Sequence, residues 1–579
     1  MKATLSACPL DCYDGCEIVY EDGVKPLKGG YTQGFLCPHM NHYHKHDRIT
    51  KPRYKGKEIS MQEALDKLCS MIDTDGSDKT LFYKGSGNFG LMQDVTSEMF
   101  AQMGATLTDG SLCDGAGEAG IIQGRGSNKN MPVSEIAKSD VVIFWGRNPH
   151  TTSSHLLPLI EGKKIIVIDP VQTQIAKMAD LHIWLQPHAD MFFAMLFVRF
   201  LHINFLCNEE YLEKYGSEFE DYYELTQTVR IKAYLEKAGV TLGDIGRMME
   251  LVTNKKVAIV VGVGVQKYLD GADIMRSIDA VAVALGLFGK EGCGVAYLGN
   301  SKEGITTPFT TSAKKVSKVN TPFENFSTVF VQGANPLAQM PDTTRVQKSM
   351  KQVKNLVYFG LYENETSAMA DLVIPAKTFL EKDDIRTSYG DHRMMIMQKQ
   401  LNSDIGISEY QLASFLADKY NLDLATEEDL IEHFRSHSVI KIDGSCEVEA
   451  RETIPYQDGF DTDDGEFAFL EEYDVEEQEG DFFLVTPKSK RSLNSQFYRE
   501  SKLYIKDGLG YSDGDMVMVC SPNGSVTLPV ETTNILRNDT VLIYSGTPGV
   551  NILTSSQHSL DGKCAIFQEN RVTITKIDK

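Results

Sequence analysis

Four of the chain's eleven cysteines fall within its first 37 residues, at Cys8, Cys12, Cys16 and Cys37. Three residues separate each of the first three from the next, and the fourth follows after twenty more. Four thiolates that converge on one small volume can hold an iron–sulfur cubane. Zinc also takes four cysteines, but its sites more often pair two C-x2-C motifs. The spacing favours a [4Fe-4S] cluster, with zinc or unliganded core cysteines as the alternatives.

A fifth cysteine, Cys113, stands in a glycine-rich bend that runs from Thr108 to Gly120. Core packing explains a cysteine in such a bend poorly, so its thiol is a candidate reactive group or metal ligand. Asp114 follows it. That carboxyl could act as a general base if burial raises its pKa, or it could cap the helix that begins there.

The elements that must position these residues alternate between apolar strands and amphipathic helices, which predicts a layered α/β protein with parallel sheets. We expect a helix over about 60–72 and a second helix that ends near 287. We expect strands at 81–83, 140–145, 164–168, 257–261 and 329–332. Beyond residue 481, short runs at 515–520, 524–530, 540–544 and 565–574 predict a separate β-rich domain.

Polar loops follow three of the predicted strands. In open parallel sheets, ligands bind beyond the carboxyl ends of strands, where these loops stand. Asp169-Pro170 could also simply end its strand. The Gly-x-Asn-Pro pattern of the first loop recurs in the third. The candidate binding residues are Gly146, Asn148, Pro149, Asp169, Pro170, Thr173, Gly333, Asn335 and Pro336.

The segment GFLCPHMNHYHKHDRITKPRYKGKEISMQEALDKL (34–68) resembles the N-terminal domain of molybdopterin oxidoreductases of the dimethyl sulfoxide reductase class. In that family a basic stretch, an Arg-Ile/Leu-x-x-Pro turn and an amphipathic helix follow the fourth cysteine, and Arg48 to Pro52 supply the turn here. The resemblance implies that the four N-terminal cysteines bind a [4Fe-4S] cluster. It also implies that Cys113 is the protein ligand of molybdenum or tungsten.

Two residues depart from the family pattern. His39 stands where many members carry a lysine, which is thought to lie between cluster and pterin. It could take over that role, or it could be an ordinary loop histidine among His42, His44 and His46. Asp114 replaces a histidine that formate dehydrogenases of this family use in proton handling, which places formate oxidation in doubt.

The resemblance further implies a bis(molybdopterin guanine dinucleotide) cofactor, bound by two Rossmann-like domains and a C-terminal β-barrel. The polar loops above would contact its nucleotides. Pro187-His-Ala-Asp190 stands where the family often has Pro-Gly-Thr-Asp, so the glycine is missing but the acid of Asp190 is kept. In the barrel, the matching positions are Thr486, Asn494, Ser495, Gln496 and Asn551.

The chain carries 58 basic and 80 acidic residues, a net charge of −22, which argues against nucleic-acid binding. No apolar run approaches the roughly 20 residues of a membrane span, and no signal peptide is recognisable, so we expect a cytoplasmic protein. Twelve acidic residues and no Lys or Arg fall within 458–481. This stretch reads as a solvated linker, or alternatively as an acidic docking surface for a redox partner.

Together, these features predict a [4Fe-4S] cap over 1–56, two interleaved Rossmann-like domains over 57–425, an acidic linker region over 426–481 and a molybdopterin dinucleotide-binding β-barrel over 482–579. We expect a formate dehydrogenase-like or sulfur/N-oxide reductase-like enzyme that acts on a small substrate. It would exchange electrons with a carrier protein or an iron–sulfur partner subunit. The alternatives are a catalytically silent electron-relay or structural subunit of a larger redox complex, and a non-redox hydratase on the same cofactors.

Overall fold

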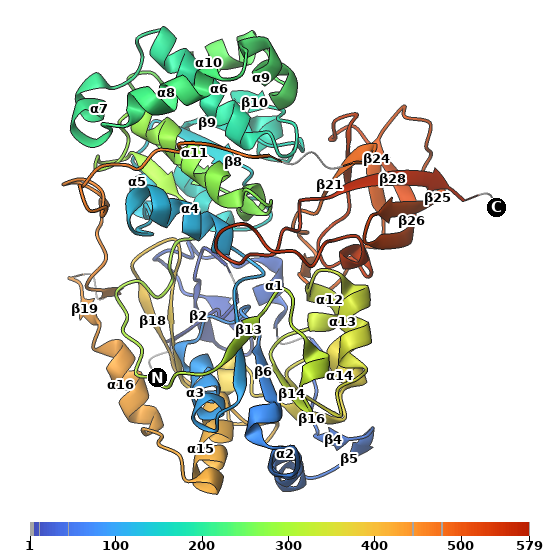
Figure 1. Cartoon of the computed structure of the whole chain (residues 1–579). Coiled ribbons are helices and arrows are strands. Elements are labelled where there is room, and N and C mark those ends of the chain that lie inside the picture. The colour runs from blue at the N-terminus through green and yellow to red at the C-terminus, as the bar shows by residue number, and fades with distance from the viewer. Residues whose placement is uncertain (1–4, 11, 44–45, 443–444, 476–478, 578–579) are drawn as a thin grey trace. The chain divides into compact units, whose positions relative to one another are not determined.

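The computed structural model describes residues 5–10, 12–43, 46–442, 445–475 and 479–577. The chain divides into two compact units, each assembled from distant segments (Figure 1). Unit 1 comprises residues 1–109, 301–388 and 392–451, and unit 2 comprises residues 110–300, 389–391 and 452–579. Within the described ranges, no helix combines the length and the apolar character that a membrane span requires.

Unit 1 is built on an eight-stranded sheet in which six neighbouring strands run parallel, and the two short strands at one end each pair antiparallel with the strand before. Its order is β13 (Lys315–Ser317), β7 (Thr106–Asp109), β6 (Thr80–Lys84), β14 (Thr328–Gln332), β15 (Asn355–Gly360), β16 (Leu372–Pro375), β4 (Arg53–Tyr54) and β5 (Lys57–Glu58). The central strand β14 is buried along its whole length, as expected of a parallel strand covered on both faces. The apolar run of β14 is the feature of the sequence that predicted this strand.

Helices line this sheet, and the sequence predicts the first of them well. Helix α2 (Met61–Asp75) begins at Ser60, which forms a capping box with Glu63, and it buries the predicted apolar stripe. The helix expected over 60–72 is therefore confirmed and extends slightly further. Further helices of unit 1 are α3 (Val95–Gln102), α12 (Pro336–Gln339), α13 (Thr343–Met350), α14 (Glu365–Met369), α15 (Glu409–Tyr420) and α16 (Glu427–Arg435).

The N-terminal segment of unit 1 forms its own small layer. Strands β1 (Leu5–Ala7), β2 (Glu17–Tyr20) and β3 (Val24–Pro26) make an antiparallel meander, and the first cysteine loop joins β1 to β2. The hairpin of β17 (Asp384–Thr387) and β18 (Met394–Met397) packs against β1, and helix α1 (Pro38–Asn41) follows Cys37. A second hairpin joins β19 (Ser438–Ile440) to β20 (Cys446–Val448).

Unit 2 contains a five-stranded, fully parallel sheet. The strand order is β10 (Leu181–Ile183), β9 (Lys164–Ile168), β8 (Val141–Trp145), β11 (Val257–Val261) and β12 (Gly294–Ala296). Helices α4 (Gly115–Arg125), α6 (Asp190–Ile203) and α11 (Gly271–Ala284) pack together beside it. Further helices are α5 (Val133–Ile136), α7 (Glu209–Tyr215), α8 (Phe219–Gln227), α9 (Ile231–Ala238) and α10 (Leu242–Val252).

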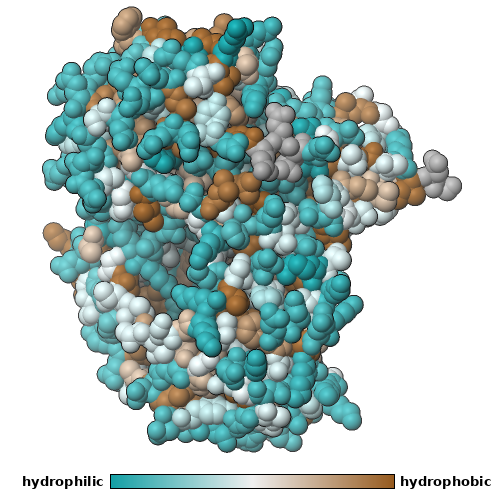
Figure 2. Space-filling view, in the orientation of Figure 1, coloured by the Kyte–Doolittle hydropathy of each residue, from teal (hydrophilic) through white to brown (hydrophobic). Residues whose placement is uncertain are grey.

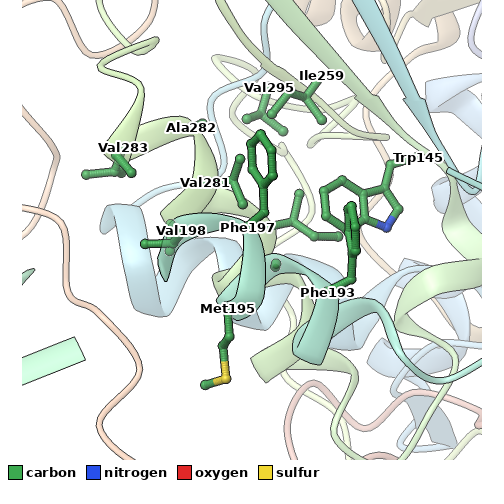
Figure 3. Close-up of a cluster of buried hydrophobic side chains, with 14 of the residues drawn as sticks. Trp145, Phe193, Met195, Phe197, Val198, Ile259, Val281, Ala282, Val283 and Val295 are labelled. Atoms are coloured by element: carbon green, nitrogen blue, oxygen red, sulfur yellow. The ribbon is translucent and has the colours of Figure 1, made fainter. Parts of the chain in front are cut away.

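The main core of unit 2 lies between this sheet and its helices (Figure 3). Trp145 from β8 meets Phe193 from α6 edge to face, with ring centroids 5.6 Å apart. Phe197 and Val281 fill the space between α6 and α11, and all four side chains are fully buried or nearly so. The predicted helix that ends near 287 is α11, which ends at Ala284.

The acidic stretch 458–481 is more than the solvated linker that its charge predicts. Phe460, Phe467, Phe469 and Leu470 are buried in the core of unit 2, while the acidic side chains between them stay mostly exposed. The ring of Phe467 would lie 2.6 Å from a Cβ at Gly124 of helix α4, so the glycine makes room for it. The stretch is therefore a packed segment of unit 2, in which burial of the aromatic residues outweighs the repulsion between the acidic side chains.

Hydrophilic residues cover most of the face in Figure 2.

The C-terminal part of unit 2 is a closed six-stranded barrel, as predicted. Its order is β21 (Phe482–Val485), β27 (Thr540–Leu542), β24 (Leu503–Lys506), β26 (Gly524–Thr533), β25 (Met516–Ser521) and β28 (Arg571–Lys576), with the short hairpin of β22 (Ser492–Leu493) and β23 (Gln496–Phe497) beside it. The last strand begins later than expected. Residues 565–570 form a loop instead, because Ala565 and Gln568 donate their N–H groups to the carbonyls of Ser111 and Lys267.

Candidate functional site

The four N-terminal cysteines lie close together in unit 1. The N–H of Cys8 donates to the carbonyl of Cys16 over 2.8 Å. Burial is the main cause that raises the pKa of all four thiols, to about 12 for Cys8. Negative charge on neighbouring cysteines raises the pKa of Cys8, Cys12 and Cys16 further. Such mutual effects require the thiols to be near one another.

This donor set fits an iron–sulfur cluster. All eleven cysteines of the chain are described and all are free thiols, so the four are not consumed in disulfides. Buried thiols that oppose each other's ionisation need a source of positive charge to become thiolates, and the iron of a cluster supplies it. A tetrahedral zinc ion would take the same four donors.

A residue from far along the chain holds the cysteine loop. Arg386 of β17 is completely buried, and its guanidinium donates to the carbonyls of Cys8 and Cys12, the latter over 2.9 Å. Ser388 and Arg393, on the same hairpin, donate to the carbonyls of Tyr13 and Asp14 over 3.0 Å. Sequence reasoning missed this clamp, because nothing local to Arg386 marks it.

His39 lies on the short helix α1, two residues after Cys37, and is half-buried. Burial is the main cause that lowers its pKa, and the charge of the neighbouring His46 lowers it further. His42 is exposed, and His44 lies outside the described residues.

The two Gly-x-Asn-Pro loops are built alike, one in each unit. Gly146 follows β8 with a φ of 60°, and Gly333 follows β14 with a φ of 54°, a left-handed conformation that glycine adopts without strain. Each glycine N–H donates to a carbonyl at the end of the adjacent strand: Gly146 to Ile168 over 2.8 Å, and Gly333 to Phe359 over 2.9 Å. Each loop therefore lies at the carboxyl edge of its own parallel sheet.

The asparagines of these loops fix the loop backbone. Asn148 donates to the hydroxyl of Thr151 over 3.0 Å, within its own loop. Asn335 donates to Glu365 over 2.7 Å and accepts from Thr366, at the start of helix α14. Pro149 is buried, and Pro336 opens helix α12. Both asparagine side chains thus form hydrogen bonds within their own loop or with the start of a neighbouring helix.

Two predicted acidic residues of unit 2 lie beyond strands, one directly after β9 and the other at the start of α6. Asp169, after β9, accepts the N–H of Val171 over 2.8 Å, and burial raises its pKa to about 7. Asp190, at the start of α6, accepts the indole N–H of Trp145 over 2.6 Å, and burial raises its pKa to about 6. The negative charge of Asp190 is a further cause that raises the pKa of Asp169. Both carboxyls are thus costly to ionise without a hydrogen-bonding partner.

Pro170 and Thr173 occupy the same loop as Asp169. The carbonyl of Pro170 accepts the indole N–H of Trp184 over 2.7 Å, and the hydroxyl of Thr173 accepts the N–H of Ala176 over 3.4 Å. The loop also bonds to the barrel, since the N–H of Gln172 donates to the carbonyl of Ile535 over 2.8 Å.

His188, which the sequence pattern matched to a glycine, has a φ of 67°, in the left-handed region that favours glycine. Its ring stacks on Tyr268 at 4.2 Å, and its Nε2 lies 2.7 Å from a carboxylate oxygen of Asp270. Its Nδ1 lies 3.8 Å from Glu569. Burial alone would lower its pKa, but these carboxylates raise it above its usual value. A cavity of 170 Å³ adjoins the ring.

Of the barrel residues predicted from sequence, Thr486 and Asn494 contact neighbouring loops. The backbone N–H of Thr486 donates to the side chain of Gln568 over 3.2 Å, and that side chain returns a bond of 3.1 Å to the Thr486 hydroxyl. Asn494 adopts a φ of 52°, and its carbonyl would lie 1.8 Å from a Cβ at Gly546, so these two loops touch. Ser495 is buried, Gln496 lies in β23, and Asn551 lies in the 3₁₀ turn Val550–Ile552.

Cys113 is half-buried in unit 2, two residues before the first residue of helix α4. Its N–H donates to the hydroxyl of Ser111 over 2.9 Å. The amide of Gln266 donates to the carbonyl of Cys113 over 2.8 Å and accepts the N–H of Gly117 over 2.9 Å. The ammonium of Lys267 donates to the carbonyl of Leu112 over 2.9 Å. The bend is therefore fixed on both sides of the thiol.

Asp114 occupies the N-cap position of α4, but its side chain does not cap the helix. It accepts the hydroxyl of Ser111 over 3.1 Å instead. The positive end of the helix dipole is thus left facing the Cys113 bend, which favours negative charge there. A thiolate that binds a soft, high-valent metal fits this potential.

The chain is similar to known proteins over most of its length. The family model for molybdopterin oxidoreductases matches residues 48–406, and the model for the molybdopterin dinucleotide-binding domain matches residues 482–569. Among solved structures, acetylene hydratase from Pelobacter acetylenicus has the same fold, with a TM-score of 0.76 at 15% identity. That comparison covers 98% of this chain and all of the other.

Two relatives in sequence extend the match. The probable oxidoreductase YyaE of Bacillus subtilis is 27% identical over 439 residues, which cover 69% of this chain and 66% of YyaE, slightly under two thirds of its length. The F420-dependent formate dehydrogenase subunit alpha of Methanocaldococcus jannaschii is 23% identical over 706 aligned residues, which cover 100% of this chain and 99% of that subunit. Because one family model matches well over half of the sequence, the chain belongs to the molybdopterin oxidoreductase family, in the dimethyl sulfoxide reductase class.

Proposed function

We propose that this protein is a molybdenum- or tungsten-dependent oxidoreductase with a bis(molybdopterin guanine dinucleotide) cofactor and one [4Fe-4S] cluster. It performs two-electron chemistry on a small substrate and exchanges the electrons, one at a time, through the cluster. The observation that carries the proposal is the bend at Cys113. The backbone of Cys113 is held at the start of a helix by Ser111 and Gln266, so that a single thiol is presented there. The family to which the chain belongs is named after molybdopterin.

The two Gly-x-Asn-Pro loops support a cofactor with two nucleotide arms. In both loops the glycine has a left-handed conformation, and its N–H donates to a carbonyl at the end of the adjacent strand. The two loops belong to two separate sheets. Backbone N–H groups at such strand ends suit phosphate and nucleotide edges. We assign Gly146, Asp169 and Asp190 to one nucleotide and Gly333 to the other, with Thr486 and Asn494 of the barrel as pterin contacts.

The four N-terminal thiols support the cluster. Their convergence, their free state and their mutual charge effects suit a ligand that brings its own positive charge. His39, next to them, is assigned to the path between cluster and pterin. Asp114 is assigned to proton handling beside the metal. If His39 carries electrons between the two centres, His39→Ala should slow turnover with unchanged iron and metal contents.

The names of relatives support part of the proposed range of substrates. Formate dehydrogenase subunits and an assimilatory nitrate reductase catalytic subunit are among them, at 22–24% identity. We propose a formate-, sulfur- or N-oxide-type substrate and an electron-carrier protein or iron–sulfur subunit as partner. The formate dehydrogenase relatives are named as alpha subunits, which supports a partner subunit.

Metal and pterin analysis of anaerobically purified protein tests the proposal. An enzyme of this kind should hold one molybdenum or tungsten per chain, two pterins and four irons. Iron without molybdenum, tungsten or pterin would assign the chain to the electron-relay alternative. Turnover of formate, sulfur or N-oxide substrates with a viologen dye would then separate redox chemistry from hydration, which leaves the dye unchanged.

A further inference from the structure

Arg386 carries a buried positive charge that no carboxylate of the described chain neutralises. Its side chain is completely buried in unit 1. Within the described ranges, its guanidinium donates only to carbonyls, those of Cys8, Cys12 and Thr387, the last two over 2.9 and 3.3 Å, and it forms no ion pair. A buried charge is costly unless it is paired, so this guanidinium calls for a counter-charge.

Two other arginines of unit 1 show the usual arrangement. Arg393, on the same hairpin, lies 3.0 Å from a carboxylate oxygen of Glu17, and Arg48 lies 2.6 Å from one of Glu381. The side chains of Arg393 and Arg48 are 12% and 16% exposed. Arg386 is thus buried more deeply than either, yet it is the one that lacks a carboxylate.

The surroundings of Arg386 keep water away from its charge. The ring of Phe89 lies over the guanidinium, with 5.2 Å between the ring centroid and the guanidinium carbon. The N–H of Phe89 donates to the carbonyl of Pro9 over 3.0 Å, so this ring is fixed to the cysteine loop. In such a dry environment a charge acts more strongly on its neighbours than it would at the surface.

The iron–sulfur cluster supplies the missing counter-charge. A cubane cluster held by four thiolates carries net negative charge, and reduction adds one more electron to it. Two of the carbonyls that bind the guanidinium belong to Cys8 and Cys12, which are proposed ligands of that cluster. A fixed positive charge at this place favours the reduced state over the oxidised state, because the reduced cluster is the more negative of the two.

We propose that the charge of Arg386 stabilises the reduced state of the [4Fe-4S] cluster and thereby raises its reduction potential. This inference rests on the cluster of the proposed function. It separates two roles of one side chain. The hydrogen bonds hold the backbone of the ligands, and the charge sets how readily the cluster accepts an electron.

Three substitutions separate the charge from the hydrogen bonds. Arg386→Gln keeps a donor without the charge, Arg386→Lys keeps the charge with fewer donors, and Arg386→Met keeps neither. The measurement is a redox titration of anaerobically purified protein, followed by the paramagnetic resonance of the reduced cluster. At a fixed potential, the Gln and Met variants should lower the ratio of reduced to oxidised cluster about tenfold, equal to about 59 mV for a one-electron couple. The Lys variant should stay close to the wild type.

A second pair of variants leaves Arg386 in place. Phe89→Glu brings a carboxylate to the guanidinium and offsets its charge, and Phe89→Gln is the matched uncharged control. Phe89 is half-buried, so a polar side chain can be accommodated there. The Glu variant should have the lower reduction potential of the two. This pair decides the question if the substitutions at Arg386 prevent assembly of the cluster.

The outcomes are distinct. A wild-type potential in Arg386→Gln, or an equal decrease in Arg386→Lys and Arg386→Gln, overturns the inference, because the charge is then not the cause. Equal potentials in the two Phe89 variants overturn it as well. The titration needs only the cluster, so a failure to find molybdenum, tungsten or pterin counts against the proposed function alone. A wild type without a cluster refutes both.

Discussion

The N-terminal cysteines and Cys113 stand in contrasting surroundings. Cys8, Cys12 and Cys16 lie in a buried group whose members raise each other's pKa. Cys113 is a single half-buried thiol at the positive end of helix α4, with its backbone pinned by Gln266. The first region is stable as a set of thiolates only around a positively charged ligand, whereas the second is arranged in advance for one negative sulfur.

The contrast shows two ways of building a metal site. A cluster loop depends on all of its thiols and on the charge of its ligand, so folding and ligand binding are coupled there. A preorganised bend keeps its shape without the metal, because the Ser111 hydroxyl accepts the N–H of Cys113, and Gln266 and Lys267 donate to carbonyls of the bend. Substitutions in the two regions should therefore differ in kind, and the following four run from the largest expected effect to the smallest.

Cys16→Ser should abolish the cluster. Removal of one of four thiolates leaves the set incomplete, so the visible absorbance and the acid-labile sulfide should be lost entirely, and unit 1 should become less stable. Iron and sulfide analysis after anaerobic purification measures the effect. Cys520→Ser, on β25 of the barrel, is the control and should keep both. Full iron and sulfide in Cys16→Ser would refute the ligand assignment.

Cys113→Ala should leave iron untouched and remove most of the activity. Loss of a ligand should cost at least as much as loss of a residue that merely orients one, which is about 10–100-fold. X-ray absorption of the loaded metal should show one sulfur fewer, while the melting temperature of cofactor-free protein changes little. An unaltered metal spectrum with unaltered turnover would remove Cys113 from the site.

Arg386→Met should loosen the cluster loop without removing a ligand. Two carbonyls that now accept from the buried guanidinium would lose their partner, and hydrogen bonds to a charged donor contribute ~1.5–3 kcal/mol each. We expect a lower free energy of unfolding and faster release of iron to a chelator. Arg386→Lys should recover part of both. If iron release in the Met variant matched the wild type, the clamp would have no bearing on the cluster.

His188→Gln should change the pH dependence of stability, a modest effect. The pKa of His188 is raised in the folded protein, so its pairing with Asp270 stabilises fully below the unfolded pKa, about pH 6.5. That stabilisation is lost as the pH rises through the folded value. The difference in unfolding free energy between wild type and variant should therefore shrink from pH 6 to pH 9. A constant difference would mean that the pair is not ionic.

Local sequence was enough for the elements that depend on local order. The capping box of Ser60 with Glu63 and the apolar stripe behind it predicted α2, because helix ends and helix faces are set by residues three or four apart. Apolar runs predicted β8, β9 and β11 for the same reason. The closed barrel was also predicted. The strand expected over 565–574 was wrong in its first half, since Ala565 and Gln568 bond to distant loops there.

The acidic stretch shows where composition misleads. Its charge predicted a solvated linker, and its four buried apolar side chains were too widely spaced to alter that prediction. Whether a sparse aromatic side chain is exposed or buried depends on whether another surface has room for it. Gly124 supplies that room for Phe467, and the two are far apart in sequence.

By itself, the sequence determined the spacing of the cysteines, the strand-and-loop order and the two Gly-x-Asn-Pro loops, because each is a property of neighbouring residues. Only the tertiary structure decided which side chains serve those motifs. Arg386 reaches Cys12 across 374 residues, and Gln266 reaches Gly117 across 149. His188, whose φ is in the left-handed region, contacts Tyr268 and Asp270 through its ring across 80 residues or more. Chain topology, not local pattern, brings such partners together, so no reading of nearby residues could have named them.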